Sequence, residues 1–247
     1  MIEAKEFIEA ARELGFVRYT GVPCSFLTPF INYVINDNVL EYIASTNEGD
    51  ALATTSGSVI GGQRSIVMMQ NSGLGNAVSP ITSLSYIFRI PFLIIVTHRG
   101  EPGVKDEPQH ELMGQITEEL FNTMQIPSET FPSETKEIIP ALQRAEKFMS
   151  KEHRPYAFIM KKGSIAPQKL DKKMIKDIAK SETEIRSLFD EKLTRLDRNT
   201  VLRHIINHAS VDDSILIATT GFTGRELFSI NDRVNHIYMV GSMGCAS

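Results

Sequence analysis

Glu48 is the residue of this sequence whose type and position could do the most chemistry. It lies in TNEGDA, between the apolar run Leu40–Ser45 and a helical pattern from Asp50 through Val59. A carboxylate in such a turn can accept a hydrogen bond from a ligand or move a proton. The competing interpretation is that Glu48 and Asp50 are acids of a helix's first turn, where the helix dipole favours negative charge. Position alone favours the second interpretation.

Two glycines follow another apolar run, SIVMM. In QNSGLGN, Gly73 and Gly75 would let the backbone come close to a ligand. A dinucleotide-binding fingerprint also needs a third glycine and an acid at the end of the next strand. Val78 occupies that glycine position, and the next predicted strand ends in Thr-His at 97–98. The sequence therefore argues against a nicotinamide cofactor.

Other residues of these turns suggest different chemistry. Cys24, in GVPCSF, could be drawn as a nucleophile served by a histidine of the segment THRGEPGVKDEPQH (97–110). Four side chains of that segment could be drawn as metal ligands: His98, Asp106, Glu107 and His110. Neither set matches a known spacing template, and a free cysteine is commonly a small buried side chain. The segment is more simply a solvated lid, whose basic residues could attract an anionic substrate.

The elements that must position these turns form a repeated helix-to-strand pattern. The chain begins with apolar residues at helical spacing that end at Gly15. Strand-like runs follow at Phe16–Val22, Leu40–Ser45, Ser65–Met69, Phe92–Thr97 and Tyr156–Met160. Each gap is long enough for a crossover helix, and several runs lack alternation, which is typical of strands covered on both faces. The pattern predicts an α/β fold, a doubly wound parallel sheet, whose ligands collect at the carboxyl ends of the strands.

The chain changes character after this first domain, which we place at residues 1–165. Residues 166–196 are polar and rich in Lys and Glu, which predicts an interdomain linker. Residues 197–247 read as the start of a second, similar α/β domain, with a helix at 199–209, the strand SILIAT, a short helix, the strand HIYMV and the turn GSMG. About 50 residues with two strands are too few for a self-sufficient core. We therefore expect this second domain to be incomplete.

Composition excludes several classes of protein. The 247 residues include 26 Lys and Arg against 30 Asp and Glu, so a formal charge of −4 leaves no broad basic surface for nucleic acid or an anionic membrane. The longest clean apolar run, Ile90–Val96, is too short to span a bilayer. The two cysteines, Cys24 and Cys245, offer no disulfide framework. We expect a soluble, cytoplasmic protein without a targeting segment.

Several of these segments, in this order, resemble one enzyme family. GVPCSFL, STNEGDAL, QNSGLGNAVSPITSL and THRGEPGVKDEPQH are similar to the pyrimidine-binding domain of thiamine diphosphate-dependent 2-oxoacid decarboxylases, in particular the phosphonopyruvate decarboxylases and the related sulfopyruvate decarboxylases. IATTGFTGRELF and MVGSMGCAS resemble the beginning of that family's diphosphate-binding domain. No single motif decides the matter, but several in one order are specific, and they favour the catalytic interpretation of Glu48.

The resemblance implies a cofactor and a reaction. Thiamine diphosphate would lie between the pyrimidine domain of one subunit and the diphosphate domain of another, so that the protein is at least a homodimer. Glu48 would hydrogen-bond N1′ of the aminopyrimidine ring and favour its imino tautomer. The reaction implied is decarboxylation of 3-phosphonopyruvate to phosphonoacetaldehyde and CO2 in phosphonate biosynthesis. Two alternatives stay open: a sulfopyruvate decarboxylase, or a non-catalytic pyrimidine-domain subunit that pairs with a diphosphate-domain partner.

The resemblance also gives roles to further residues. A wall of the cofactor crevice would come from Gly73, Leu74, Gly75 and Asn76. The diphosphate would face Thr220 and Gly221. The thiazolium side would contact Gly241, Ser242, Met243 and Gly244, with Met243 either a wedge that holds the cofactor bent or a core side chain. The anionic groups of the 2-oxoacid substrate would be bound by Ser25, His98, Arg99 and His110.

One element of the family is missing from the sequence. The family's Gly-Asp-Gly motif, followed later by Asn, anchors Mg²⁺ and through it the diphosphate, and no Gly-Asp-Gly occurs in the 247 residues. Diphosphate is held chiefly through a hard cation with oxygen ligands. We therefore expect a truncated form that binds the cofactor poorly and shows little activity unless a separate chain supplies this metal-binding loop.

Overall fold

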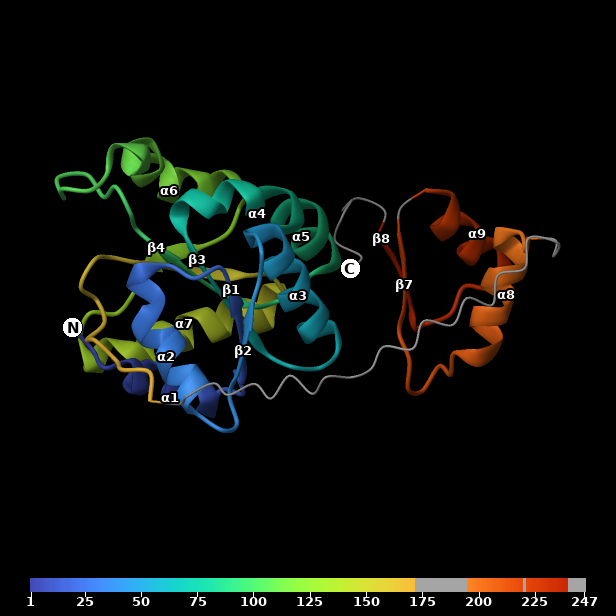
Figure 1. The fold of residues 1–247 in the computed structure, drawn as a ribbon, viewed down its shortest axis with the longest axis horizontal. Coiled ribbons are helices and arrows are strands. Elements are labelled where there is room, and N and C mark those ends of the chain that lie inside the picture. The colour runs from blue at the N-terminus through green and yellow to red at the C-terminus, as the bar shows by residue number, and fades with distance from the viewer. Residues whose placement is uncertain (172–194, 220, 240–247) are drawn as a thin grey trace, which may run out of the picture. The chain divides into compact units, whose positions relative to one another are not determined.

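A computed structural model describes residues 1–171, 195–219 and 221–239 of the chain. Within these ranges the polypeptide forms two compact units, one within residues 1–171 and one within residues 195–239 (Figure 1). No helix of the described ranges is long and apolar enough to cross a bilayer.

The first unit is built on a six-stranded parallel sheet. Its strands are β1 (Arg18–Gly21), β2 (Glu41–Ala44), β3 (Ser65–Gln70), β4 (Leu93–Thr97), β5 (Ser128–Thr130) and β6 (Tyr156–Met160), in the order β2-β1-β3-β4-β6-β5. Every neighbouring pair is parallel. The predicted doubly wound α/β fold is confirmed. The short edge strand β5 was not predicted, because its three residues are polar and none is fully buried, and such a segment has no apolar pattern.

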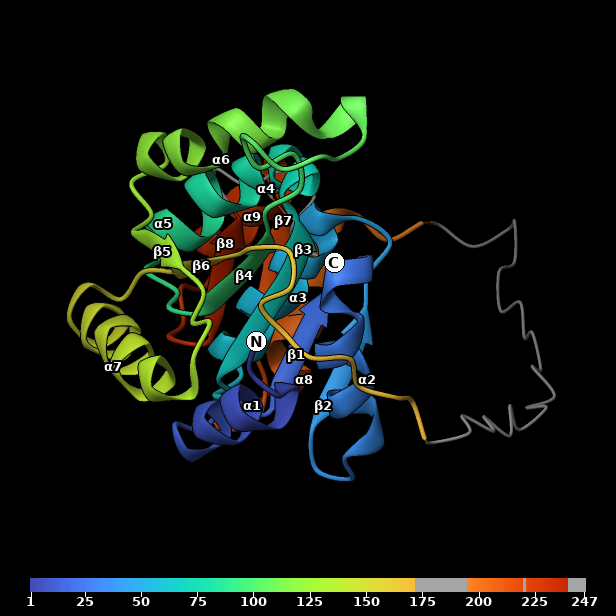
Figure 2. The same ribbon diagram turned by 90° about the vertical axis from the view of Figure 1, so that its left-hand side faces the viewer.

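Helices cover both faces of this sheet. Figure 2 shows α1 (Ala4–Glu13) and α7 (Thr135–Glu152) on one side, and α4 (Leu74–Pro80), α5 (Tyr86–Phe88) and α6 (Glu111–Thr123) on the other. Helix α2 (Thr28–Asn36) packs on α1, and α3 (Glu48–Ile60) packs on α4. Because both faces are covered, all residues of β4 are buried, which explains the apolar run without alternation.

A group of aromatic rings fills the core beneath α1 and α7. Phe7, Phe30, Phe131 and Phe158 are almost completely buried, and their ring centroids lie 4.7 to 6.0 Å apart in the contacting pairs. Edge-to-face contacts of this kind add to the free energy gained by burial. This dense side holds the sheet in place, while the turns at its carboxyl edge carry the polar residues.

The second unit is a single βαβ step with one preceding helix. It contains α8 (Arg198–His208), β7 (Leu216–Thr219), α9 (Phe222–Ile230) and β8 (His236–Met239), and β7 pairs with β8 in parallel. Its core is small: Leu202, Ile206, Ala218 and Leu227. The predicted second α/β unit is present as a small parallel sheet, and the predicted limits of the linker, 166 and 196, stay predictions.

Candidate functional site

The order in which successive strands are added to the sheet changes direction between β1 and β3. From β1 the chain continues to β2 on one side, and β3 then lies on the other side of β1. At such a point the connections leave toward opposite faces and open a crevice at the carboxyl ends of the strands, where ligands of doubly wound proteins bind. The turns after β1, β2, β3 and β4 all begin at this edge, and they contain the residues of the first unit that were singled out from the sequence.

Glu48 is the first residue of α3, so the helix begins two residues earlier than predicted. The reason is Asn47, whose side-chain oxygen accepts a hydrogen bond from the backbone N–H of Asp50 at 3.1 Å and caps the helix. Glu48 is only 9% exposed, and Asn76 Nδ2 donates to its Oε2 at 2.9 Å. Asp50 is half-buried, and its carboxylate accepts hydrogen bonds from the side chains of Thr46 and Asn47. Burial separates Glu48 from an ordinary acid of a first helical turn.

Gly73 faces the Glu48 carboxylate from the turn after β3. A Cβ atom at position 73 would overlap Oε1, Cδ and Cγ of Glu48. The φ angle of Gly73 is −76°, which any residue can adopt, so the glycine is needed for close approach and not for backbone conformation. The structure thus brings Glu48, Gly73 and Asn76 together. Of the other two proposed wall residues, Leu74 is a buried core side chain and Gly75 is exposed with open space around it.

The arrangement at Glu48 fits an aminopyrimidine ring. In the described part of the chain, the carboxylate receives its side-chain hydrogen bond at Oε2, from Asn76. Oε1 keeps its capacity to accept a hydrogen bond from a ring N–H of a bound molecule. For a metal ion, residues 1–171, 195–219 and 221–239 contain no group of three or more His, Cys, Asp or Glu side chains that could hold one.

Arg99 forms an ion pair with Asp106 in the segment after β4. Its Nε and Nη2 donate to Oδ2 and Oδ1 of Asp106 at 2.7 and 2.5 Å, and both side chains are less than 20% exposed. This ion pair, together with the backbone N–H groups of Gly100 and Glu107, holds the pKa of Asp106 well below its usual range. The guanidinium also lies 4.9 Å from the ring centroid of Phe26. The charge that the sequence suggested for substrate binding is therefore balanced by Asp106 in this conformation.

His98 anchors the same segment to α6. Its Nε2 donates to the backbone oxygen of Gly114 at 2.8 Å, and its Nδ1 is sealed from solvent with no hydrogen-bond partner among the residues that the structure describes. The backbones cross so closely that a Cβ on Gly114 would overlap the carbonyl group of Gly100. The expectation that residues 97–110 are solvated is therefore wrong at both ends of the segment and is confirmed only for its exposed middle, 102–105 and 107–109. Its role as a lid stays a prediction.

Ser25 and Cys24 occupy the turn after β1. Ser25 begins a short 3-10 helical segment, is exposed, and lines a cavity of about 260 Å³ together with Lys161 and Lys162. Cys24 is a buried free thiol, as the sequence suggested. Its Sγ donates to Gln70 Oε1 at 3.4 Å.

Gln70 is the residue that sequence reasoning missed. It ends β3, and its side chain reaches Cys24, Ser72 and His110. His110 is 8% exposed and directly precedes α6. The available signal was a polar residue at the end of the otherwise apolar strand SIVMMQ, at the edge where ligands are expected.

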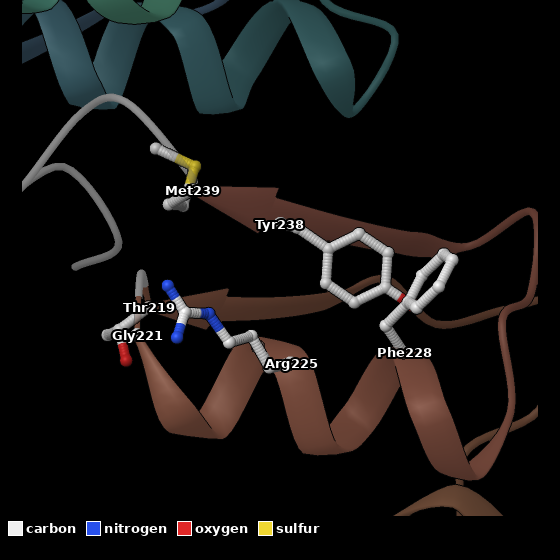
Figure 3. Close-up of a pocket in the computed structure, with 7 residues that line it drawn as sticks. Thr219, Gly221, Arg225, Phe228, Tyr238 and Met239 are labelled. Atoms are coloured by element: carbon white, nitrogen blue, oxygen red, sulfur yellow. The ribbon is translucent and has the colours of Figure 1, made fainter.

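The second unit has its own pocket at its strand ends. About 380 Å³ of space is lined by Thr219, Gly221, Arg225, Met239 and neighbouring residues of α9 and β8. Gly221 has a φ of 97°, which favours glycine, and the Arg225 guanidinium points toward it and Thr219 (Figure 3). A cation beside a helix N-terminus suits an anion. The proposed contacts Thr220, Gly241, Ser242, Met243 and Gly244 lie outside the described residues.

Comparison with known proteins gives relatives of one kind. No family model matches the chain. Phosphonopyruvate decarboxylase of Streptomyces viridochromogenes is 36% identical over 247 residues, which is all of this chain and 62% of that protein. Sulfopyruvate decarboxylase subunit alpha of Methanococcus maripaludis is 38% identical over 133 residues, 53% of this chain and 79% of that subunit. Sulfopyruvate decarboxylase subunit beta of Methanothermobacter thermautotrophicus is 51% identical over 37 residues, 15% of this chain and 20% of that subunit.

Solved structures show the same fold at low sequence identity. Benzoylformate decarboxylase of Polynucleobacter necessarius matches 89% of this chain and 39% of its own with a TM-score of 0.54 and 17% identity. Thiamine diphosphate-dependent 4-hydroxybenzoylformate decarboxylase of Rhodococcus jostii RHA1 matches the same shares with a TM-score of 0.51 and 14% identity. This chain spans about 62% of the length of the phosphonopyruvate decarboxylase that it matches. With a sulfopyruvate decarboxylase subunit covered over 79% of its length at 38% identity, the chain belongs to the thiamine diphosphate-dependent decarboxylases, among the relatives of phosphonopyruvate decarboxylase.

Proposed function

We propose that this chain supplies the cofactor-activating carboxylate of an enzyme that decarboxylates 3-phosphonopyruvate to phosphonoacetaldehyde and CO2. The observation that carries the proposal is the buried Glu48 carboxylate, which Asn76 holds through Oε2 while Oε1 stays available above Gly73. The relative that aligns with all of this chain, over 62% of its own length, is a phosphonopyruvate decarboxylase, and this name supports the choice of substrate.

The residues of the first unit have distinct tasks in this proposal. Bound thiamine diphosphate supplies the electron sink that the loss of CO2 requires. Glu48 would accept a hydrogen bond from the N1′–H group of the ring and exchange that proton with it. Asn76 fixes the orientation of the carboxylate, and Gly73 leaves room for it. Asn47 holds the backbone of Glu48 in place by capping α3.

The remaining contacts concern anionic groups. Ser25 and His110 are proposed to bind the substrate, and Arg99 would join them if a substrate anion shared its guanidinium with Asp106. His98 is left out of this set, because one ring nitrogen is engaged and the other is sealed. In the second unit, Gly221 with Thr220 is proposed to face the diphosphate, and 241–244 the thiazolium. A polypeptide that carries Gly-Asp-Gly is proposed to supply the Mg²⁺ site.

The test compares Glu48→Gln with a first-turn acid elsewhere. The chain is combined with a diphosphate-domain polypeptide of the family, thiamine diphosphate and Mg²⁺, and phosphonoacetaldehyde is measured. Glu48→Gln should lower kcat by at least about 100-fold, because the amide cannot exchange the proton. Glu111→Gln removes an exposed acid from the first turn of α6 and should leave kcat unchanged. Full activity of Glu48→Gln would favour a non-catalytic pairing subunit.

Sulfopyruvate is the second candidate substrate. Matches to both an alpha and a beta subunit of sulfopyruvate decarboxylases favour it. Sulfonate and phosphonate are both tetrahedral anions, so similar cationic contacts could bind either. The kcat/KM values for 3-phosphonopyruvate and sulfopyruvate, measured on one assembled preparation, decide between them. A ratio in favour of sulfopyruvate would overturn the proposed substrate and leave the role of Glu48 intact.

A further inference from the structure

One side chain connects three of the turns at the carboxyl edge of the sheet. Gln70 Oε1 lies 3.4 Å from Cys24 Sγ, in the turn after β1. Gln70 Nε2 lies 2.5 Å from Oγ of Ser72, in the turn between β3 and α4. The same nitrogen lies 3.4 Å from Nδ1 of His110, which directly precedes α6. Thr97, the last residue of β4, adds its hydroxyl 3.5 Å from Cys24 Sγ. Gln70 is therefore the centre of a hydrogen-bonded network.

Counting donors and acceptors favours one direction for these hydrogen bonds. A glutamine amide has two N–H donors on nitrogen and an acceptor oxygen. With Nε2 toward Ser72 and His110, both donors meet acceptors, and the oxygen accepts the thiol proton of Cys24. With the amide reversed, the oxygen could accept from the Ser72 hydroxyl and from a proton on His110 Nδ1, but the nitrogen would face only Cys24, and one N–H would have no partner among the described residues. The first orientation satisfies more groups and is the one in the structure.

This orientation determines where the ring of His110 carries its proton. Because Gln70 Nε2 donates to Nδ1, that nitrogen must present a lone pair, and a neutral ring then holds its proton on Nε2. Within the described ranges, His110 Nε2 forms no hydrogen bond, and it is not sealed from solvent. The ring thus offers an N–H to a molecule at the strand ends.

We infer that Gln70 is a positioning residue that holds His110 as the Nε2–H tautomer, so that the turn before α6 presents a neutral donor to an anionic or carbonyl oxygen of the substrate. The inference deepens the proposed function, since it rests on substrate contact by His110. The tautomer itself is a property of the chain alone, and it can be tested without turnover. Among the proposed binding residues, His110 is the one that Gln70 contacts, and this contact determines whether Nε2 of the ring carries a proton.

The direct test is nuclear magnetic resonance of the chain labelled with ¹⁵N-histidine. Long-range ¹H–¹⁵N correlations separate a protonated from an unprotonated ring nitrogen, and the His110 signals are identified by their loss in His110→Asn. Wild type should show protonated Nε2 and unprotonated Nδ1. Gln70→Glu replaces the donor by an acceptor and should move the proton to Nδ1 or place one on each nitrogen. A proton on Nδ1 in wild type, or an unchanged pattern in Gln70→Glu, would overturn the inference.

Gln109→Glu is the matched control. It adds the same negative charge next to His110 in sequence, from an exposed side chain outside the network. Its His110 pattern should equal that of wild type; if it changes like that of Gln70→Glu, charge alone explains the effect and the inference fails.

Kinetics of the assembled enzyme separate this inference from the proposed function. Gln70→Leu should lower kcat/KM by about tenfold or more through misplacement of the ring. Adding Gln70→Leu to His110→Asn should cost little further, because both changes remove one interaction. If His110→Asn alone leaves kcat/KM unchanged, the substrate role of His110 is wrong, whatever tautomer is found. If Gln70→Leu lowers kcat/KM as strongly in the His110→Asn background, Gln70 does not act through His110 and the inference fails.

Discussion

At the scale of single residues, the environment of a carboxylate decides what it can do. Glu48 and Asp50 are two residues apart in the first turn of α3. The half-buried Asp50 accepts hydrogen bonds from Thr46 and Asn47, whereas Glu48 is buried and, within the described ranges, accepts a side-chain hydrogen bond from Asn76 alone. An acid that is buried with spare acceptor capacity is costly unless something occupies that capacity. The cost of holding Glu48 there is consistent with a ligand-binding role.

Gly73→Ala should displace that carboxylate. The new Cβ would overlap the Glu48 side chain, although the backbone angle tolerates alanine. We expect the variant to lose about 1–3 kcal/mol of unfolding free energy, the usual cost of overpacking. Glu48→Ala removes the atoms that collide, so Gly73→Ala should cost little in that background. Urea unfolding of the four proteins measures this coupling, and equal costs in both backgrounds would contradict the close approach.

The Arg99–Asp106 pair predicts a pH dependence of stability. Because the folded-state pKa of Asp106 is lowered, chiefly by Arg99, the pair stabilises the fold above the unfolded-state pKa, near 3.9, and loses this effect as pH falls toward the folded value. Asp106→Asn should therefore be less stable than wild type at pH 6, and the difference should shrink below about pH 4. Thermal unfolding of both proteins from pH 6 to 3 measures it. A difference that stays constant with pH would show that the charge is not responsible.

At the scale of elements, two helical glycines make opposite demands. Gly114 lies inside α6 where its backbone crosses that of Gly100, and no room exists for a Cβ. Gly57 lies inside α3 on its exposed side, with nothing within 4 Å of a Cβ. The first glycine allows the close contact that holds the segment after β4, whereas the second only weakens its helix.

Alanine at these two positions should have opposite effects on stability. Gly57→Ala should raise the free energy of unfolding by about 0.5–1 kcal/mol, because alanine is the better helix former. Gly114→Ala should lower it by at least about 2 kcal/mol despite the same gain in propensity, because backbone atoms must move apart. Chemical denaturation gives both values. Stabilisation by Gly114→Ala would mean that α6 and residue 100 do not approach each other as described.

The elements also show which signals a sequence carries. The strands β3, β4 and β6 were predicted almost to the residue, because buried parallel strands are apolar runs bounded by turns. The edge strand β5 and the π-helical segment Ile81–Ser85 were not, because the first is polar and the second differs from an α-helix only in its hydrogen-bond pattern.

The site was predictable in its location but not in its contacts. The turns after the strands indicated the edge of the sheet, and Glu48 was selected by resemblance to a family. The Arg99–Asp106 ion pair joins residues 7 positions apart, the His98–Gly114 hydrogen bond joins residues 16 apart, and the Gln70–His110 contact joins residues 40 apart. All three depend on how the turns at the sheet edge fold back on one another. No local spacing pattern contains such information.

At the scale of the whole molecule, the two units differ in how much apolar surface they bury. The first has a core that combines α1, α2, α7 and four strands, whereas the described part of the second buries four apolar side chains in its cluster. Large side chains of the second unit are exposed: Ile215, Ile217, Phe222, Phe228 and Val234. Burial of apolar surface is the main source of folding free energy, so the two units should differ strongly in autonomous stability.

Expression of the two parts separately should reveal this difference. Residues 1–171 alone should unfold in one cooperative transition and keep slowly exchanging amides in β3 and β4, because all six strands of the sheet and their pairings lie within this part. Residues 195–247 alone should show no cooperative transition, since the two strands and two helices described within 195–239, with so small a core, cannot offset the lost chain entropy. Circular dichroism on heating and amide hydrogen exchange test both statements. Cooperative unfolding of the 195–247 fragment would show that its exposed apolar side chains are covered in solution, by a second copy of the fragment or by residues outside the described ranges. A transition temperature that rises with protein concentration would identify the second copy as the cover.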